Sequence, residues 1–260
     1  MVRLAAALAL LLSGAAGAAP SRVVSVNLCT DQLALLIAAP GQLASVSYVA
    51  ADPRVSLMAD QAAKLPLNHA RAEEIFLSRP DLVLASTYSD PALLALLARL
   101  GLRVETLPPA RRIADMRENI TRMGALLDRP DRAAQLLAGF DADLARIGPG
   151  TGRLATSYGA NGFANGAGTL SGDVMRRAGL MLLAERLGLP QGGQVALEQL
   201  VMADPDLIVT GTRETTPSRA EALLDHPAFA AIPARQLSVP DRDWICGLPA
   251  VAGVAARLAQ

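Results

Sequence analysis

The stretch "AEEIFLSRPDLVLAS" (residues 72–86) recurs as "LEQLVMADPDLIVTG" (residues 197–211), and this repeat decides the fold. Each copy carries a Glu, Glu73 or Glu198, followed seven residues later by Pro-Asp-Leu and a short apolar run. The apolar run is typical of a buried strand, and the segment before it has the composition of a helix. A helix–turn–strand unit that occurs twice, with the acid retained, predicts a chain with two similar halves.

The composition limits the classes of function. The chain has 260 residues, enough for one large or two modest domains, and 24 Lys plus Arg balance 24 Asp plus Glu. With no basic excess and no nucleic-acid motif, we expect no nucleic-acid partner. The only histidines and cysteines, His69, His226, Cys29 and Cys246, lie far apart and do not form a zinc-site pattern.

The first 20 residues, "MVRLAAALALLLSGAAGAAP", have the layout of a signal peptide. Arg3 precedes a short apolar run, and small residues allow cleavage after Ala18 or Ala19. The apolar run is too short to span a bilayer, and Cys29 is too far from the cleavage site to carry a lipid anchor. We therefore expect an exported, soluble protein of the periplasm without membrane insertion.

Strand-like and helix-like segments alternate along most of the chain. Strands are expected at 22–26, 43–48, 81–86, 103–107, 153–158, 206–210 and 235–239. Helices are expected between them, at 30–39, 70–79, 91–101, 172–179, 196–204, 217–225 and 249–260. This alternation predicts an α/β fold with two Rossmann-like lobes, each a mainly parallel sheet flanked by helices.

The middle of the chain breaks the alternation with two consecutive helices, expected at 113–128 and 130–147. The second helix begins at Pro130, has one apolar stripe and would extend roughly 27 Å, the scale of a small domain. We expect it to join the lobes. The predicted parts are a signal peptide (1–19), an N-terminal lobe (20–128), a bridging helix (129–148) and a C-terminal lobe (149–260).

The order of these segments resembles a known family. The relevant stretches are "RVVSVNLCTDQLALLIA" (22–38), the two repeats, the long middle helix, "GTLSGDVMRRAGL" (168–180) and "RDWICGLPAVAGVAARLA" (242–259). Together they are similar to the substrate-binding proteins of ABC importers for vitamin B12 and ferric siderophores, the class with a rigid interdomain helix. The resemblance implies a monomeric, non-catalytic protein without an intrinsic cofactor. It would capture a ferric siderophore, haem or cobalamin and deliver it to an inner-membrane ABC permease.

The resemblance also implies a function for the repeated acids. In that family each lobe carries an exposed Glu that docks onto permease arginines, and the matching positions are Glu73 and Glu198. Carboxylate–Arg pairs are strong, and a two-lobed binder on a two-fold permease needs one acid in each half. Glu74 is an alternative to Glu73. Both acids also suit a first helical turn, where the helix dipole favours them.

Ligands of open α/β sheets bind beyond the carboxyl ends of the strands, which face the cleft in a two-lobed binder. Aromatic side chains there suit a large flat ligand, and arginines suit its anionic groups. The candidate ligand-binding residues are Asn27, Cys29, Tyr48, Arg54, Tyr88, Tyr158, Phe163, Arg213, Arg242 and Trp244.

Cys29 and Cys246 both follow expected strands and would face each other from opposite lobes. They are compatible with a disulfide in an oxidising compartment, with two separate buried cysteines, or with thiols near a soft metal. The sequence leaves these alternatives open.

Two other function classes fit the sequence less well. An exported hydrolase or transferase would need a nucleophile and a base, but no G-x-S-x-G motif occurs. A divalent-metal binder would need several His and carboxylate ligands, and only two histidines are present. The Gly-rich loop at 159–168 lacks both nucleotide-binding signatures, so we interpret it as part of the ligand site.

Overall fold

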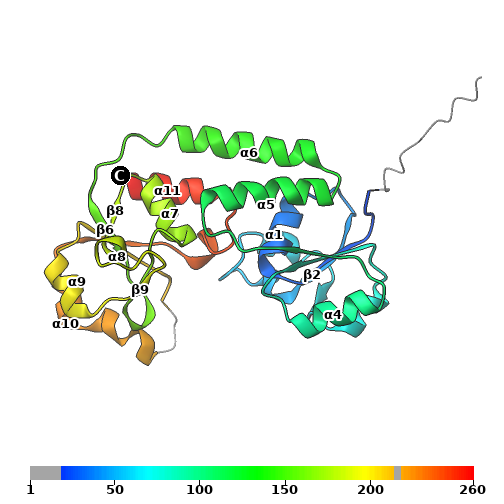
Figure 1. Cartoon of the computed structure of the whole chain (residues 1–260), viewed down its shortest axis with the longest axis horizontal. Coiled ribbons are helices and arrows are strands. Elements are labelled where there is room, and N and C mark those ends of the chain that lie inside the picture. Colours follow the sequence, from blue (N-terminus) through cyan, green and yellow to red (C-terminus); the bar gives the residue numbers. More distant parts are fainter. Residues whose placement is uncertain (1–18, 214–217) are drawn as a thin grey trace, which may run out of the picture.

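The computed structural model describes residues 19–213 and 218–260 of the chain. Two α/β lobes lie side by side, and the long helices α5 (Ile113–Leu126) and α6 (Pro130–Ala145) run along one side of the molecule (Figure 1). The expected signal peptide lies almost entirely outside the described residues, so its cleavage near Ala19 stays a prediction.

The first lobe is built on a five-stranded parallel sheet with the order β3-β2-β1-β4-β5. Its strands are β1 (Val23–Ser25), β2 (Leu43–Ser47), β3 (Leu67–Asn68), β4 (Leu82–Ser86) and β5 (Val104–Leu107). Its helices are α1 (Leu28–Ile37), the 3₁₀ helix η1 (Tyr48–Ala51), α2 (Ala59–Ala62), α3 (Ala72–Leu77) and α4 (Pro91–Arg99).

The second lobe has a four-stranded parallel sheet with the order β11-β10-β6-β8, and a small antiparallel pair, β7-β9. The strands are β6 (Leu154–Ser157), β7 (Phe163–Ala164), β8 (Met181–Leu182), β9 (Gly193–Gln194), β10 (Leu207–Thr210) and β11 (Arg235–Ser238). The α-helices are α7 (Leu170–Arg177), α8 (Leu183–Arg186), α9 (Leu197–Ala203), α10 (Pro227–Ala230) and α11 (Val251–Ala259). The 3₁₀ helices are η2 (Ala160–Gly162), η3 (Arg219–Asp225) and η4 (Asp241–Asp243).

The two sheets share one strand order. The order β8-β6-β10-β11 of the second lobe corresponds to β2-β1-β4-β5 of the first, which has β3 as an additional edge strand. All seven strands expected from the sequence are present, and the alternating pattern correctly predicted two mainly parallel sheets. The two-residue strands were not predicted, because so short a segment has no measurable periodicity. Residues 219–225 form a 3₁₀ helix instead of the expected α-helix.

The sequence repeat corresponds to one local structure used twice. Arg79 and Asp204 occupy equivalent positions at the ends of α3 and α9, and both have left-handed backbones, with φ of 48° and 45°. A left-handed residue ends a helix, and the proline that follows it cannot continue one. Pro80 and Pro205 are both buried. Each copy therefore turns sharply from a helix into a central strand.

The Asp of each Pro-Asp-Leu then fixes the start of the neighbouring strand. The Asp206 carboxylate accepts a hydrogen bond from the Leu154 N–H at 2.7 Å, and the Asp81 carboxylate accepts one from the Arg22 N–H at 3.0 Å. The backbone N–H groups of Asp81 and Asp206 donate to the carbonyls of Arg22 and Leu154, respectively. The repeated Asp thus sets the register between the first strand of each lobe and its partner.

Helix α6 joins the lobes. Near its start Arg132 donates from Nε to the Leu36 carbonyl of α1 at 3.1 Å, and near its end Arg177 of α7 donates to the Leu144 carbonyl at 2.6 Å. Its 16 residues span about 24 Å. The expectation of one long interdomain helix is confirmed, whereas the lobe boundaries drawn around residues 129–148 stay a prediction.

A single apolar core runs under α5 and α6 from one lobe into the other. It contains Val23 of β1, Met116 of α5, Phe140 of α6, Met175 of α7 and Leu258 of α11, all of which are buried. Because protein cores are close-packed, relative motion of the lobes would have to break these contacts. The two lobes are therefore held together by packing as well as by the chain.

Cys29 and Cys246 form a disulfide that links the lobes, with a Cα–Cα separation of 4.9 Å. Of the alternatives that the sequence left open, the structure selects the disulfide. It joins the first turn of α1 to the segment after η4, 217 residues apart in sequence.

Replacing both cysteines, as Cys29→Ser with Cys246→Ser, should lower the free energy of unfolding. Loop-closure entropy for so long a loop sets an upper estimate of about 5 kcal/mol. The measurement is urea unfolding with and without reductant, followed by fluorescence of Trp244, the only tryptophan. Reductant should lower the stability of the wild type to that of the variant. Equal stability of variant and oxidised wild type would contradict the link.

Candidate functional site

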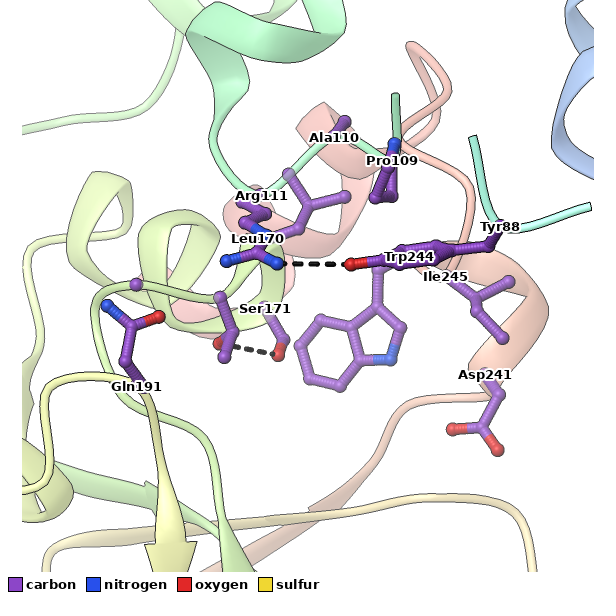
Figure 2. A pocket seen from close by; sticks show the side chains of 12 residues that line it. Tyr88, Pro109, Ala110, Arg111, Leu170, Ser171, Gln191, Asp241, Trp244 and Ile245 are labelled. Carbon is purple, nitrogen blue, oxygen red and sulfur yellow. Dashed lines mark hydrogen bonds between the residues drawn. The ribbon is translucent and has the colours of Figure 1, made fainter. Parts of the chain in front are cut away.

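The carboxyl ends of the strands of both lobes lie at a series of neighbouring cavities that share lining residues. One of them has a volume of about 490 Å³ and is shown in Figure 2. The first lobe contributes the loop after β5, with Ala110 and Arg111, and Tyr88 after β4. The second lobe contributes Thr169 and Trp244 among others. The cavity therefore lies between the lobes, as the strand-end rule predicts.

Tyr88 and Arg111 form a polar pair on the wall from the first lobe. The Arg111 guanidinium donates to the Tyr88 hydroxyl oxygen at 3.1 Å (Figure 2). Tyr88 is 71% exposed, so its phenol ring stands in the cavity and not in the core. The Asp115 carboxylate accepts hydrogen bonds from the backbone N–H groups of Arg111 and Arg112, at 3.0 and 3.1 Å, and fixes the start of α5 beside the pair. The phenol oxygen thus has a guanidinium group beside it at the cavity wall.

Trp244 contributes a rigid aromatic surface. It is only 9% exposed and belongs to the interlobe core, yet it borders both the cavity in Figure 2 and a neighbouring cavity of about 280 Å³. The disulfide at Cys246, two residues further on, ties this segment to α1. A large ring anchored in this way offers a preformed flat contact to a ligand.

The wall from the second lobe is polar and close to the backbone. Thr169 caps α7, since its hydroxyl accepts from the Gly172 N–H at 3.1 Å and donates to the Gly166 carbonyl at 2.8 Å. The Gln191 amide lies against Gly168, where an added Cβ would approach it within 2.5 Å. The glycine lets the two loops meet, and Ser171 lines the same wall.

Arginines gather in a further cavity of about 590 Å³, which is lined by Arg54, Arg213 and Arg242. Arg213 makes a bidentate pair with Asp225, at 2.7 and 2.8 Å, which lowers the pKa of that carboxyl. Arg242 donates to the Pro53 carbonyl of the opposite lobe at 2.6 Å.

Arg54 pairs with Asp52 at 2.6 Å, and this hydrogen bond lowers the pKa of Asp52 to about 2. The three guanidinium groups are therefore partly compensated but remain grouped on one rim. From the sequence, each of these arginines is a separate candidate for ligand contact, and the fold places all three around one cavity.

Other predicted site residues border the smaller cavities. Asn27 caps α1 by accepting from the Cys29 N–H at 3.1 Å, and both residues line a cavity of about 140 Å³ that also touches Tyr88. Phe163, on β7, lines the cavity of about 280 Å³ together with Arg213.

Tyr158 and Tyr48 differ from the expectation. Tyr158 borders the second cavity, but its side chain is fully buried, stacks on Phe229 and donates from its hydroxyl to the Val195 carbonyl at 3.0 Å. Burial also raises the pKa of its phenol. The side chain therefore supports the cavity wall from the core, and its contact with a ligand stays a prediction. Tyr48 is exposed, stacks on His69, and lines none of the cavities described above.

Several cavity residues were missed by the sequence reasoning. Arg111 follows β5, and the strand-end rule applied to residues 108–111 would have found it. Gln191 and Ser171 carry no such signal, since they reach the cavity from a turn and from a helix start.

Glu73 and Glu198 are both exposed, in the first turns of α3 and α9, one on each lobe. Neither carboxylate makes a hydrogen bond or ion pair within the described part of the chain. Glu74, by contrast, accepts from the His69 N–H at 2.8 Å, which lowers its pKa. Gln199, at the equivalent position of the second repeat, accepts from the Ala196 N–H. Glu74 and Gln199 thus accept hydrogen bonds at the starts of their own helices, whereas the carboxylates of Glu73 and Glu198 face the solvent.

Within residues 19–213 and 218–260 there is no cluster of three or more His, Cys, Asp and Glu side chains that could hold a metal ion. No helix in these ranges is long and apolar enough to cross a membrane.

Comparison with known proteins agrees with this architecture. Residues 23–236 match the family described as periplasmic binding protein. The chain belongs to this family. Members are substrate-binding proteins that deliver small molecules to ABC permeases. A comparison with curated protein sequences finds no match.

Solved structures of this binding protein's relatives share its fold. The HutB haem-binding protein of Vibrio cholerae superposes with a TM-score of 0.76 at 18% identity, covering 92% of this chain and 97% of that one. A periplasmic haem-binding protein from Pseudomonas aeruginosa gives 0.70 at 24%, with 92% and 91% covered. The vitamin B12 binder BtuF of Vibrio cholerae gives 0.64 at 18%, with 92% and 95% covered.

Beneath the site lies a buried carboxylate, Asp31 of α1. It accepts a hydrogen bond from the Ser47 hydroxyl, and its other oxygen has no partner. Burial raises the pKa of Asp31 from 3.8 to about 6, against the opposing effect of hydrogen bonds from Ser25 and Ser47. The binding protein thus carries a destabilising charge below its cleft at neutral pH.

Asp31→Asn should change how stability depends on pH. The native state binds the extra proton between pH 3.8 and about 6, so this group's contribution to the free energy of unfolding falls as pH rises through that window. The variant, relative to wild type, should gain about 2 kcal/mol between pH 4 and pH 7. Urea unfolding at each pH measures this difference, and Asp60→Asn at an exposed position of α2 is the control. A pH-independent difference would contradict the raised pKa.

Proposed function

We propose that this protein is the periplasmic receptor of an ABC importer for a ferric chelate of the haem type. The observation that carries the proposal is the Tyr88–Arg111 pair, which faces a cavity bordered by Trp244 from the opposite lobe. The pair supplies a donor atom, and the indole supplies an aromatic contact. The proposal concerns binding and transport, without chemistry at the site.

A phenol oxygen is a suitable ligand for ferric iron, and tyrosine is one of the residues that hold haem iron in proteins. The Arg111 guanidinium lies beside the Tyr88 oxygen, with a hydrogen bond of 3.1 Å, and both side chains border the cavity. A flat chelate with an open coordination position would place its metal there. A coordinatively saturated siderophore or corrinoid would gain nothing from this donor.

The size and charge of the neighbouring cavities support the same ligand class. Volumes of about 490 and 280 Å³ share Trp244 and fall in the range of small-molecule sites. The arginine cavity adjoins the second of these through Arg213, so carboxylate groups on the edge of a planar ligand would meet guanidinium groups. Several structural relatives are named as haem binders, which favours haem over cobalamin or a ferric hydroxamate.

The ties between the lobes support capture with little hinge motion. The disulfide, the Arg242 contact to Pro53 and the shared core all bridge the cleft. A preformed site lowers the entropic cost of ordering on binding. The receptor acts as a monomer. Its signal peptide directs export and is cleaved near Ala19.

Glu73 and Glu198 are the residues that dock onto the permease. Their exposure, their position on opposite lobes and the local use of Glu74 favour Glu73 as the acid of the first lobe. An unpaired carboxylate on a short helix is available to a basic group of the partner.

Tyr88→Phe should weaken the binding of hemin to the purified mature protein by at least about tenfold, a loss of one coordination bond. It should also abolish the charge-transfer absorption of a phenolate bound to ferric iron. The measurements are the visible spectrum and quenching of Trp244 fluorescence. Tyr48→Phe, at a tyrosine outside the cavities, is the matched control and should bind as wild type. Tight binding of cobalamin or a ferric hydroxamate in place of hemin would overturn the ligand assignment.

Glu73→Ala combined with Glu198→Ala should abolish uptake while leaving hemin affinity unchanged, because docking is lost and the cleft is intact. Uptake of radiolabelled iron supplied as hemin is measured in native host cells whose own copy of the gene is deleted. Glu74→Gln serves as the control and should retain transport. Loss of hemin affinity in the double variant would show that the acids belong to the cleft and not to docking.

A further inference from the structure

Each docking helix carries exposed apolar side chains next to its unpaired acid. In α3, Phe76 is 47% and Leu77 is 77% exposed, and in α9, Val201 is 43% and Met202 is 85% exposed. Exposed large apolar side chains are ordinary when scattered, but a matched set on two lobes requires a reason.

The apolar residues and the acids share a helix face in both lobes. Phe76 and Leu77 lie three and four residues after Glu73, and these spacings place side chains side by side on a helix surface. Val201 and Met202 have the same spacing from Glu198. The intervening residues, Ile75 and Leu200, are buried and anchor the two helices to their lobes.

The repeat retains this face but not the charges that flank it. Where α3 is flanked by the basic residues Arg71 and Arg79, the second lobe has Ala196 and Asp204. The basic side chains are therefore not repeated, whereas the acid and the apolar pair are. A partner that binds both lobes through the same kind of contact can use only the repeated residues, which are the acid and the apolar pair.

We propose that Phe76 and Leu77 on one lobe and Val201 and Met202 on the other form twin apolar platforms that pack against the two halves of the permease. In each platform the apolar pair lies one helical turn after the docking carboxylate. The inference rests on the proposed docking function. It adds that the apolar platforms supply most of the affinity for the permease, whereas the acids fix the orientation of the receptor on it.

The charge of the surface argues for this partner over two others. The acidic residue at one end of each platform would be repelled by an anionic membrane surface. Two copies of this chain pairing through the same surfaces would bring like charges together. A two-fold symmetric protein with a basic group inside an apolar recess on each half fits both the acid and the apolar pair of each platform. Desolvation inside such a recess strengthens the carboxylate–cation pair.

The test uses the purified mature protein and right-side-out inner-membrane vesicles from the native host, in a pelleting assay. Leu77→Ser with Met202→Ser should lower the affinity by about tenfold. The deficit should persist in 1 M salt, where charges are screened within about 3 Å. The deficit of Glu73→Ala with Glu198→Ala should disappear there. Leu57→Ser with Met181→Ser, at exposed apolar positions on each lobe away from α3 and α9, is the matched control.

The outcomes separate this inference from the docking proposal. Wild-type affinity of the Leu77/Met202 variant, with loss in the Glu73/Glu198 variant, overturns the platforms and leaves docking intact. Wild-type affinity of both variants overturns both. If the wild type binds protein-free liposomes of the same lipids equally well, the platforms bind the membrane and the proposal is overturned. If sedimentation shows a concentration-dependent dimer that the Leu77/Met202 variant does not form, the platforms bind a second copy of the chain, and the proposal is overturned as well.

Discussion

The apolar core that runs continuously under α5 and α6 fixes the position of the two lobes, and the site depends on it. Each lobe alone would have only its own sheet to pack on. The shared core, with Met116 and Phe140 at its centre, makes separation of the lobes costly. The disulfide at Cys29 and Cys246 reinforces the same boundary on the ligand side. A cleft between bodies fixed in this way keeps its shape whether or not it is filled.

The repeated helix–turn–strand unit shows how a sequence can specify the same geometry twice with different residues. The left-handed backbone is occupied by Arg79 in one lobe and by Asp204 in the other, and neither residue type is preferred there over glycine. The buried proline and the strand-capping Asp81 or Asp206 after it are identical. The geometry is therefore maintained by the proline, which ends the helix, and by the carboxylate, which starts the neighbouring strand. The left-handed residue just before the proline differs between the two copies.

The sequence predicted the fold well because the fold is periodic, and predicted the site less well because the site is not. The strands and the long helix follow from apolar runs, prolines and helical spacing. The pairing of Cys29 with Cys246 depends on how two distant strand ends meet, so no local pattern distinguishes it from two separate cysteines. Tyr158 follows a strand, as Tyr88 does, yet its ring turns into the core to reach the Val195 carbonyl. The direction of a side chain at a strand end depends on the neighbouring loop.

The parallel topology places ligand and partner on the same side of the molecule. In a βαβ unit the chain leaves the carboxyl end of a strand, and the next helix begins near that edge. Glu73 opens α3 just after β3, and Glu198 opens α9, the equivalent helix of the second repeat, so it lies toward the equivalent edge of its own sheet. The cavities open at the carboxyl ends of the strands too. A protein that touches both docking helices therefore faces the mouth of the cleft. Helices α5 and α6 run together along one side of the molecule (Figure 1). If Glu73 and Glu198 dock as proposed, the permease contacts the side of the receptor on which the cavities open, so release of the cargo toward it requires no rotation of the receptor.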